Sequence, residues 1–433
     1  MAVEAERYDI VLLGATGFTG IHCIPYLQKL SKENGRNLSW AISGRSEEKL
    51  KDALAQMGNK IGVDLSAVPI IISDIKNDES LANMAKQGRI VINCCGPYRF
   101  LGEPVVKACI EAGTHYVDVS GEPQFLENIQ LKYHKAAQEK GVYLVSACGL
   151  DSIPCDLGLI FLQDKFDGTL NSVVTYLYTS EEGEGLPGPA VNYGTWESLV
   201  YGLAHATELS QIRRQLFPKR LPSFKPSLQT KTLPHRPGVV DGWALPFPGA
   251  DRSVMKRTQR YMYEEENKRP VQVDTQVTFS SFIAVIFIVI SFLIWTLLVK
   301  FKWGRSLLLN YPHLFTFGMF RKDQNPSEEK INNTIFQITF YGEGWREKLP
   351  DKNDQYSNPP NKSIIARVKG RNPGYGATCA CLVGAAIILI SEKEKLPQGG
   401  GVFTPGSAFE KTSLINLLCE NGITFDIISE KDI

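Results

Sequence analysis

The stretch YDIVLLGATGFTG, residues 8–20, decides the fold of this chain. A short run of apolar and β-branched residues ends at a turn with three glycines, and the helix-like sequence IHCIPYLQKLSKE follows it. Apolar runs of this length are typical of strands, and the residues after the turn have the pattern of a helix. The chain therefore opens with a strand, a tight turn and a helix.

The same alternation continues to about residue 150. Further strand-like runs follow, separated by helix-like stretches, several of which end on glycine as helices commonly do. These runs cover residues 38–44, 68–74, 89–96, 115–121 and 142–149. Strands that alternate with helices form a parallel sheet covered on both faces. We expect residues 1–150 to form a doubly wound, dinucleotide-binding α/β domain.

The remaining residues indicate a second domain, because 433 residues exceed the usual size of one domain. Strand-like runs return at residues 334–344, 362–370 and 423–429, with helices predicted at 376–391 and 409–421. We assign residues 151–274 and 330–433 to the two parts of an α+β substrate or dimerisation domain. Residues 275–322 are assigned to a hydrophobic, membrane-anchoring segment within it.

Composition excludes several classes of function. Lys and Arg total 47 against 46 for Asp and Glu, so no global field attracts nucleic acid. Nine cysteines without a CxxC pair, and the absence of a signal-like N-terminus, predict reduced thiols facing the cytosol. The six histidines have no ligand spacing, so we expect no metal.

The glycine turn is the strongest candidate for binding chemistry. Gly14, Gly17 and Gly20 follow the first strand directly, and glycines there let backbone approach a pyrophosphate at a helix N-terminus. The alternative is a merely structural turn, but its place at the first strand favours nucleotide binding. The predicted cofactor-binding residues of the turn are Gly14, Thr16, Gly17, Phe18, Thr19 and Gly20.

The second strand indicates which nucleotide binds. It ends in AISGRS, with Ser43 and Arg45 and without the acid that an NAD site uses for the ribose 2′-hydroxyl. Arginine suits the 2′-phosphate of NADP, which is the predicted cofactor, with NAD as the alternative. Arg45 pairing with Glu47 or Glu48 on the surface would equally explain its presence.

Residues after the third and fourth strands complete the predicted site. Asp74 would lie near the adenine, or would cap the next helix. Asn93, Cys94 and Gly96, in NCCGPY, fall where the crevice at the carboxyl edge of the sheet would hold ribose and nicotinamide. Burial is the commoner role for the cysteines of this motif.

Candidates for a catalytic acid are few. Tyr98 follows the fourth strand, and Asp151, in GLDSIPCD, follows the sixth. Both would face the nicotinamide from the edge of the sheet. Capping of a helix by Asp151 and Ser152 is the favoured alternative, because a proline follows them. The chain has no Y-x-x-x-K pair, no H-E-x-x-H and no G-x-S-x-G motif.

The run TQVTFSSFIAVIFIVISFLIWTLLV, residues 275–299, carries no charge, glycine or proline. About 20 apolar helical residues can cross a bilayer, so membrane insertion is favoured over a buried core helix. A homodimer interface would hide the run equally well. Because basic residues flank both ends and the domain continues beyond the run, we expect a monotopic anchor rather than a simple span. The apolar residues 304–320 would lie in the interface beside it.

Several motifs together resemble the saccharopine dehydrogenase-like oxidoreductases, within the broader saccharopine dehydrogenase and trans-acting enoyl reductase family. They are GATGFTG, NCCGPYRFLGEPVVKACIEAGTHYVDVSGEPQF, CGLDSIPCDLG, GTWES, PFPGADRSVMKRTQRY and GGVFTPGSAF, in order along nearly the whole chain. The resemblance implies a Rossmann domain followed by an α+β domain, and association with lipid droplets or other membranes.

The predicted function is that of a NADP-dependent oxidoreductase at a lipid surface, with a lipid or lipid-linked substrate of glycolipid or lipid metabolism. The alternatives are a non-catalytic nucleotide-binding scaffold on lipid droplets or membranes, and an amino-acid dehydrogenase of the saccharopine type. The predicted location is a lipid droplet or membrane facing the cytosol, with the mitochondrion as an alternative.

Overall fold

A computed structural model describes residues 7–150, 152–183, 185–348 and 351–433. The chain divides into two compact units, neither of which is continuous in sequence. Unit 1 comprises Met1–Gly149, Tyr375–Phe403 and Lys411–Asn421. Unit 2 comprises Leu150–Gly374, Thr404–Glu410 and Gly422–Ile433.

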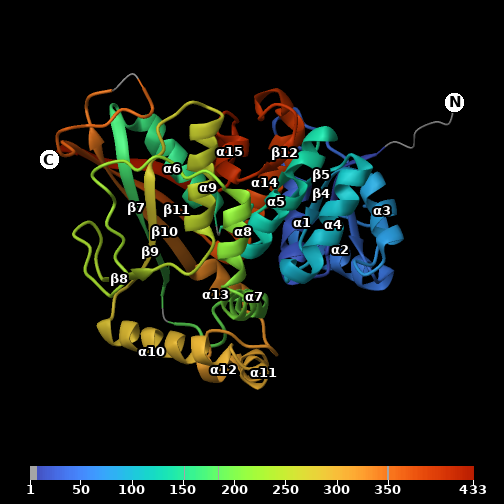
Figure 1. The fold of residues 1–433 in the computed structure, drawn as a ribbon. Coiled ribbons are helices and arrows are strands. Elements are labelled where there is room, and N and C mark those ends of the chain that lie inside the picture. The colour runs from blue at the N-terminus through green and yellow to red at the C-terminus, as the bar shows by residue number, and fades with distance from the viewer. Residues whose placement is uncertain (1–6, 151, 184, 349–350) are drawn as a thin grey trace. The chain divides into compact units, whose positions relative to one another are not determined.

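The first unit is built on a parallel sheet with the strand order β12-β6-β5-β4-β1-β2-β3. The predicted doubly wound sheet is confirmed, and its central strands are mostly buried because helices cover both faces. Figure 1 shows these helices in blue and cyan around the strands. The strands are β1 (Tyr8–Leu13), β2 (Trp40–Gly44), β3 (Ile70–Ile72), β4 (Gly88–Asn93), β5 (His115–Asp118), β6 (Tyr143–Val145) and β12 (Gly401–Phe403). The helices are α1 (Phe18–Leu30), η1 (Glu33–Gly35), α2 (Glu47–Ile61), α3 (Asp78–Lys86), α4 (Tyr98–Ala112) and α5 (Pro123–Glu139).

The C-terminal part of the chain also supplies the first unit, which differs from the predicted assignment of residues 330–433 to the second domain. After η2 (Pro373–Ala377), α14 (Thr378–Ser391) packs against α1, and β12 pairs with β6 at the edge of the sheet. η3 (Lys393–Lys395) and α16 (Leu414–Glu420) belong to the same unit. Burial explains the return, because α14 is apolar on all sides and needs a core around it.

One helix within the described residues is long and apolar enough to cross a membrane, namely Pro373–Ser391. Its apolar window is 78% buried inside the protein, which is the environment of a core helix. The apolar run identified in the sequence gives a shorter helix of 17 residues, α10 (Phe282–Leu298). Hydropathy therefore marks two helices whose surroundings differ.

The second unit contains a mixed sheet with the order β13-β11-β10-β7-β9-β8, which confirms the predicted α+β character. β7 runs parallel to β9, and the other neighbours are antiparallel. The strands are β7 (Thr169–Glu181), β8 (Trp243–Pro246), β9 (Gln272–Phe279), β10 (Thr334–Trp345), β11 (Lys362–Arg371) and β13 (Ile423–Asp432). The helices packed with this sheet are α6 (Ile153–Lys165), α9 (Asp251–Glu264) and α13 (Glu328–Asn333), and α15 (Pro405–Phe409) packs against α6 and α9.

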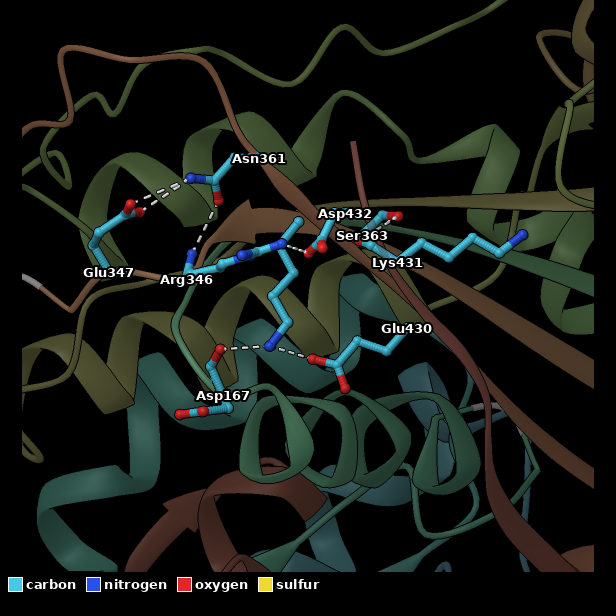
Figure 2. A network of polar contacts seen from close by, with 9 residues as sticks. Asp167, Arg346, Glu347, Asn361, Ser363, Glu430, Lys431 and Asp432 are labelled. Carbon is cyan, nitrogen blue, oxygen red and sulfur yellow. Dashed lines mark hydrogen bonds and ion pairs between the residues drawn. The ribbon is translucent and has the colours of Figure 1, made fainter.

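Charged side chains gather where β13 forms the edge of this sheet, as Figure 2 shows. Such pairs contribute little stability when they are exposed, but charge on an edge strand discourages pairing with another chain. The contacts join Arg346 to Asp432, Lys362 to Glu430 and to the carbonyl of Asp167, and Asn361 to Glu347 and to the backbone N–H of Arg346.

The predicted anchoring segment of residues 275–322 begins later than expected. Residues 275–279 belong to β9, because the alternating sequence QVDTQVTF pairs with β7 and β8. α10 is followed by α11 (Lys302–Asn310) and α12 (Pro312–Phe315). These three helices lie together and beside α7 (Tyr193–Ala204), which precedes α8 (Glu208–Leu216). In Figure 1 they project from the second unit as one group.

Candidate functional site

The glycine turn between β1 and α1 has the geometry that a close backbone approach requires. Gly14 has a φ of +82°, and a Cβ there would lie 2.6 Å from the Cys95 Sγ. A Cβ on Gly20 would lie 2.2 Å from the Gly14 carbonyl oxygen. Side chains at Gly14 and Gly20 are therefore excluded, because the turn folds back on itself.

The start of α1 offers unpaired N–H groups to an anion. Gly17 is the N-cap residue in an extended conformation, no side chain caps the helix, and the first turn contains no acid. The first N–H groups of a helix lack partners within the helix and carry the positive end of its dipole. Thr16 and Gly17 are exposed, so the residues present fit the pyrophosphate of a dinucleotide.

Phe18 and Thr19 were also predicted to bind the cofactor. The Phe18 ring and the Thr19 carbonyl both contact other parts of the first unit. The Phe18 ring packs edge-on against Tyr375, with 4.2 Å between centroids, and against His22. The Thr19 carbonyl lies 3.7 Å from the Cys379 Sγ. These contacts engage the Phe18 ring and the Thr19 carbonyl, and leave the backbone N–H groups at the helix start to face a phosphate.

Ser43 and Arg45 lie at the end of β2, next to this turn. Ser43 is fully buried, its carbonyl accepts from the Gly14 N–H at 3.0 Å, and its hydroxyl bonds to Ser73 at 2.7 Å. Ser43 therefore stabilises the glycine turn from within the protein and does not face the cofactor with its side chain. Arg45 is exposed and forms no ion pair with any described residue. The alternative of a pair with Glu47 or Glu48 is therefore wrong, and Glu47 pairs with Lys51 at 2.7 Å.

Arg45 also lies within electrostatic reach of the turn. Burial raises the pKa of Cys95 to about 12, and the positive charge of Arg45 opposes that rise. Since Cys95 borders Gly14, the guanidinium charge acts close to the predicted pyrophosphate position. An exposed arginine in this place fits the 2′-phosphate that distinguishes NADP from NAD.

Asp74 lies two residues beyond β3 and is half-buried. The helix-capping alternative for this residue is wrong, because the N-cap of α3 is Asn77, which accepts from the Ser80 N–H at 2.9 Å. Asp74 accepts instead from the Lys76 N–H in a local turn. Its placement near adenine stays a prediction.

Asn93, Cys94 and Gly96 form the loop that ends β4 beside the glycine turn. The Cys94 N–H donates to the Leu13 carbonyl at 2.9 Å, and the Cys95 N–H donates to the Asn93 Oδ1 at 3.0 Å. Gly96 is exposed. The loop is thus tied to β1, at the carboxyl edge where the nicotinamide half of a dinucleotide binds in open α/β sheets.

Tyr98 lies close to this loop but does not present its hydroxyl to solvent. The side chain is 6% exposed, and its hydroxyl donates to the Asn93 carbonyl at 2.9 Å. Burial raises the pKa of Tyr98 well above its usual value, and the nearby charge of Asp118 raises it further. Its buried, bonded hydroxyl holds the loop, which weakens the prediction that Tyr98 supplies a proton.

Sequence reasoning missed the buried network behind the loop. The Asn93 Nδ2 donates to the Tyr116 hydroxyl at 3.1 Å, which donates to the Asp118 Oδ2 at 2.7 Å. Ser146 and the backbone N–H groups of Ser120 and Ala147 also donate to Asp118. Burial raises the pKa of Asp118 to about 6, although these donors oppose the rise. The available signal was an acid at the end of the fifth strand, in HYVDVSG.

Sequence reasoning also missed Glu122. Its side chain is 4% exposed, and its carboxylate accepts from the N–H groups of Tyr98 at 2.9 Å and Arg99 at 3.2 Å. A carboxylate from the loop after β5 therefore caps α4 in place of a residue of that helix, which begins after Pro97. Nothing local in the sequence pairs Glu122 with residues 98 and 99.

Asp151, the second predicted catalytic residue, lies outside the described residues. Ser152 is the N-cap residue of α6, but its side chain makes no capping bond and donates to the Asp251 Oδ1 at 3.2 Å. Ser152 thus occupies the predicted N-cap position, but its hydroxyl bonds to Asp251 of α9 in place of a backbone N–H of the helix.

A second buried acid lies in unit 2. The Asp156 Oδ2 accepts from the Thr258 hydroxyl at 2.7 Å and from the Gly406 N–H at 2.6 Å. Its Oδ1 has no hydrogen-bond partner among the described residues. Burial raises the pKa of Asp156 to about 6. This carboxyl joins α6, α9 and the first turn of α15.

Taken together, the parallel sheet, the glycine turn at the first strand and the exposed Arg45 define a Rossmann-type protein that binds a dinucleotide. The family model of the saccharopine dehydrogenase NADP-binding domain matches residues 10–145, and the chain binds NADP.

The whole chain is similar to curated proteins. It is 42% identical to a human saccharopine dehydrogenase-like oxidoreductase, over all of both chains. It is 38% identical to a "Lipid droplet localized protein" of Caenorhabditis elegans, over 99% of this chain and all of that one. This chain belongs to the saccharopine dehydrogenase-like oxidoreductases.

A solved structure supports the fold. The apo saccharopine dehydrogenase of Saccharomyces cerevisiae matches with a TM-score of 0.54, over 98% of this chain and all of that one. Sequence identity is 14%, so the likeness concerns the fold alone.

Proposed function

We propose that this protein is a NADPH-dependent oxidoreductase that works at a lipid surface, such as that of a lipid droplet, on a lipid-linked substrate. The observation that carries the proposal is the exposed apolar face of α10 to α12, in a chain whose first unit binds NADP. Exposed apolar patches of this extent mark interaction sites. The name of the worm relative adds support for the lipid droplet.

When bound, NADPH supplies the hydride, so the protein needs to hold it, orient the substrate and manage a proton. We assign the pyrophosphate to the N–H groups around Gly17 and the 2′-phosphate to Arg45. The loop from Asn93 to Gly96 would orient the nicotinamide half, held from behind by Tyr116 and Asp118. Because these partners are buried and bonded, the loop is preorganised before the cofactor arrives.

A non-catalytic scaffold is the second candidate, and one observation favours it. The hydroxyl of Tyr98 is buried and donates to a backbone carbonyl, so this predicted proton donor is engaged elsewhere. A scaffold would bind NADPH without consuming it. The saccharopine-type reaction has no comparable support here, since the likeness to saccharopine dehydrogenase extends to the fold alone.

The experiment uses NADPH that carries deuterium at C4 of the nicotinamide, in both stereochemical forms. The full-length protein is incubated with a total lipid extract, and mass spectrometry searches for lipids that gain one deuterium. A lipid that gains deuterium from one form only identifies the substrate and supports the enzyme. NADPH binding without any labelled lipid or NADPH oxidation would overturn the enzyme and favour the scaffold.

The matched control is Gly17→Asp. Aspartate is a good N-cap residue, so α1 should form, but its carboxylate would occupy the pyrophosphate position. Labelling that persists in this variant would show that a contaminating enzyme transfers the deuterium.

A further inference from the structure

We infer that residues 280–322 lie within a single leaflet of the lipid surface and select anionic headgroups, an inference that rests on the proposed location at such a surface. The segment is called the lipid-facing arm below. It contains α10, α11, α12 and the loops around them.

One face of α10 is a continuous apolar stripe. Its exposed side chains recur every three or four residues, which places them on one side of a helix. Aromatic residues extend the surface beyond the helix, with Trp303 63% exposed and Phe317 73% exposed. The stripe consists of Ile283, Ile286, Phe287, Ile290, Leu293, Ile294 and Leu297.

The opposite face of the arm packs against α7, within the second unit. Trp196 of α7 is fully buried, donates its indole N–H to the Leu308 carbonyl at 2.9 Å, and packs edge-on against Trp295. Val299 and Phe320 belong to the same core cluster. The orientation of the stripe is therefore set by packing, and its exposure is not that of a loosely attached helix.

The path of the chain excludes a crossing of the bilayer. β9 precedes the arm and β10 follows it, and both pair with β7 in one sheet. The chain must therefore return to the side from which it left. A return crossing needs about 20 helical residues, but α11 has 9 residues and α12 has 4. The arm can lie in one leaflet only.

Charge points to the chemistry of the lipid. No Asp or Glu occurs between residues 280 and 322, whereas five basic residues do. None of these five forms an ion pair with a described residue; Lys322 bonds to Asn310 and Arg305 to the Val299 carbonyl. The five are Lys300, Lys302, Arg305, Arg321 and Lys322.

The basic residues gather where α10 ends and where the chain leaves α12. Lys300 and Lys302 are exposed and flank the exposed ring of Phe301 in the sequence, with the exposed Trp303 directly after them, and Arg321 is exposed beyond α12. Tryptophan beside lysine is typical of the headgroup level of a membrane. A second copy of the chain packed on this face would add five uncompensated positive charges, so anionic phospholipid is the better partner.

The test is flotation of the purified full-length protein with vesicles of phosphatidylcholine, and with vesicles in which a third of the lipid is phosphatidylserine. We expect several-fold stronger binding to the anionic vesicles, and a loss of this preference at high salt. Neutralising Lys300, Lys302, Arg321 and Lys322 to Gln should weaken binding to anionic vesicles by at least about tenfold. Binding to phosphatidylcholine should change little.

Two further variants keep the test decisive. Gln at Lys86, Lys107, Lys135 and Lys140 removes four exposed charges from unit 1 and should leave the preference intact. Leu293→Glu with Leu297→Glu places charges on exposed positions of the stripe and should abolish binding to both vesicles. NADPH binding is measured for every variant, because loss of vesicle binding with intact NADPH binding concerns the arm alone.

Equal binding to both kinds of vesicle would overturn the headgroup inference. If the glutamate variant left vesicle binding intact and converted a dimer into a monomer, a second copy would be the true partner of this face. Neither result would touch the proposed reductase activity, which the deuterium experiment tests separately.

Discussion

At the scale of single residues, Arg45 carries the proposed discrimination between NADP and NAD. We predict that Arg45→Glu weakens NADPH binding by roughly ten- to a hundredfold, because a charge-assisted hydrogen bond to the 2′-phosphate is replaced by repulsion. NADH binding should change little. Fluorescence titration with both cofactors measures the ratio. Lys49→Glu, an equal charge change on nearby α2, is the control, and an unchanged ratio in Arg45→Glu would refute the assignment.

Gly17 separates the structural from the binding role of the glycine turn. We predict that Gly17→Asp retains or slightly raises the melting temperature, because aspartate at an N-cap stabilises a helix by roughly a few tenths of a kcal/mol relative to glycine. Its Cβ would lie 3.2 Å from the Gly14 carbonyl oxygen, a tight but adjustable contact. NADPH binding should be lost. Calorimetry and titration together check both statements, and a folded variant with normal NADPH affinity would contradict the predicted pyrophosphate position.

Asp156 predicts a dependence of stability on pH. Burial raises its pKa from 3.8 to about 6, so the folded state holds the proton more tightly than the unfolded state. This contribution to stability is present below about pH 4 and is lost as the pH rises through about 6. Asp156→Asn does not titrate and keeps an oxygen that accepts from Thr258 and Gly406.

Comparing wild type with Asp156→Asn isolates the contribution of the Asp156 carboxyl to the pH dependence of stability. From about pH 4.5 to about pH 7.5, wild type should lose about 2 kcal/mol relative to Asp156→Asn in urea unfolding. Asp52→Asn, at an exposed position of α2, should show no such difference. Parallel pH curves for wild type and Asp156→Asn would refute the raised pKa.

At the scale of elements, the carboxyl ends of β4, β5 and β6 act together. The Tyr116 hydroxyl links Asn93 to Asp118 beneath the loop that the nicotinamide half is proposed to contact. Tyr116→Phe keeps the ring and leaves the Asn93 amide and the Asp118 carboxyl each short of a partner. We predict about tenfold weaker NADPH binding.

A cofactor fragment shows whether the loss is local. Adenosine 2′,5′-bisphosphate lacks the nicotinamide half, so its affinity should be the same in wild type and Tyr116→Phe. Tyr143→Phe removes a comparable hydroxyl from β6, one that bonds to the Pro397 carbonyl, and should affect neither ligand. Equal losses for both ligands would mean that Tyr116 stabilises the whole unit.

At the scale of the whole molecule, both sheets draw strands from both sides of the lipid-facing arm. β12 joins the first sheet after the arm, and β10, β11 and β13 join the second. We predict that Cys419, which is exposed in α16, reacts with a membrane-impermeant maleimide from the cytosolic side of sealed membranes. A cysteine placed at Lys49, before the arm, should react from the same side. Reaction of Cys419 only after permeabilisation would contradict the single-leaflet arrangement.

The sequence by itself determined the first six strands of the first sheet, the cofactor turn and the presence of an apolar segment. Residues 8–20 specify a strand, a turn and a helix through local patterns, because glycine and β-branched residues restrict the backbone wherever they occur. The absence of an acid at the end of β2 was equally local. These features required no knowledge of distant contacts.

Only the tertiary structure decided which side chains are free to act and where the apolar helices lie. Tyr98 was a reasonable acid until Asn93 supplied an acceptor for its hydroxyl. The helices α14 and α10 are both strongly apolar in composition, yet α14 is buried in a core and α10 exposes an apolar stripe. Hydropathy reports composition, whereas burial depends on which surfaces the fold brings together, and those surfaces come from residues hundreds of positions apart.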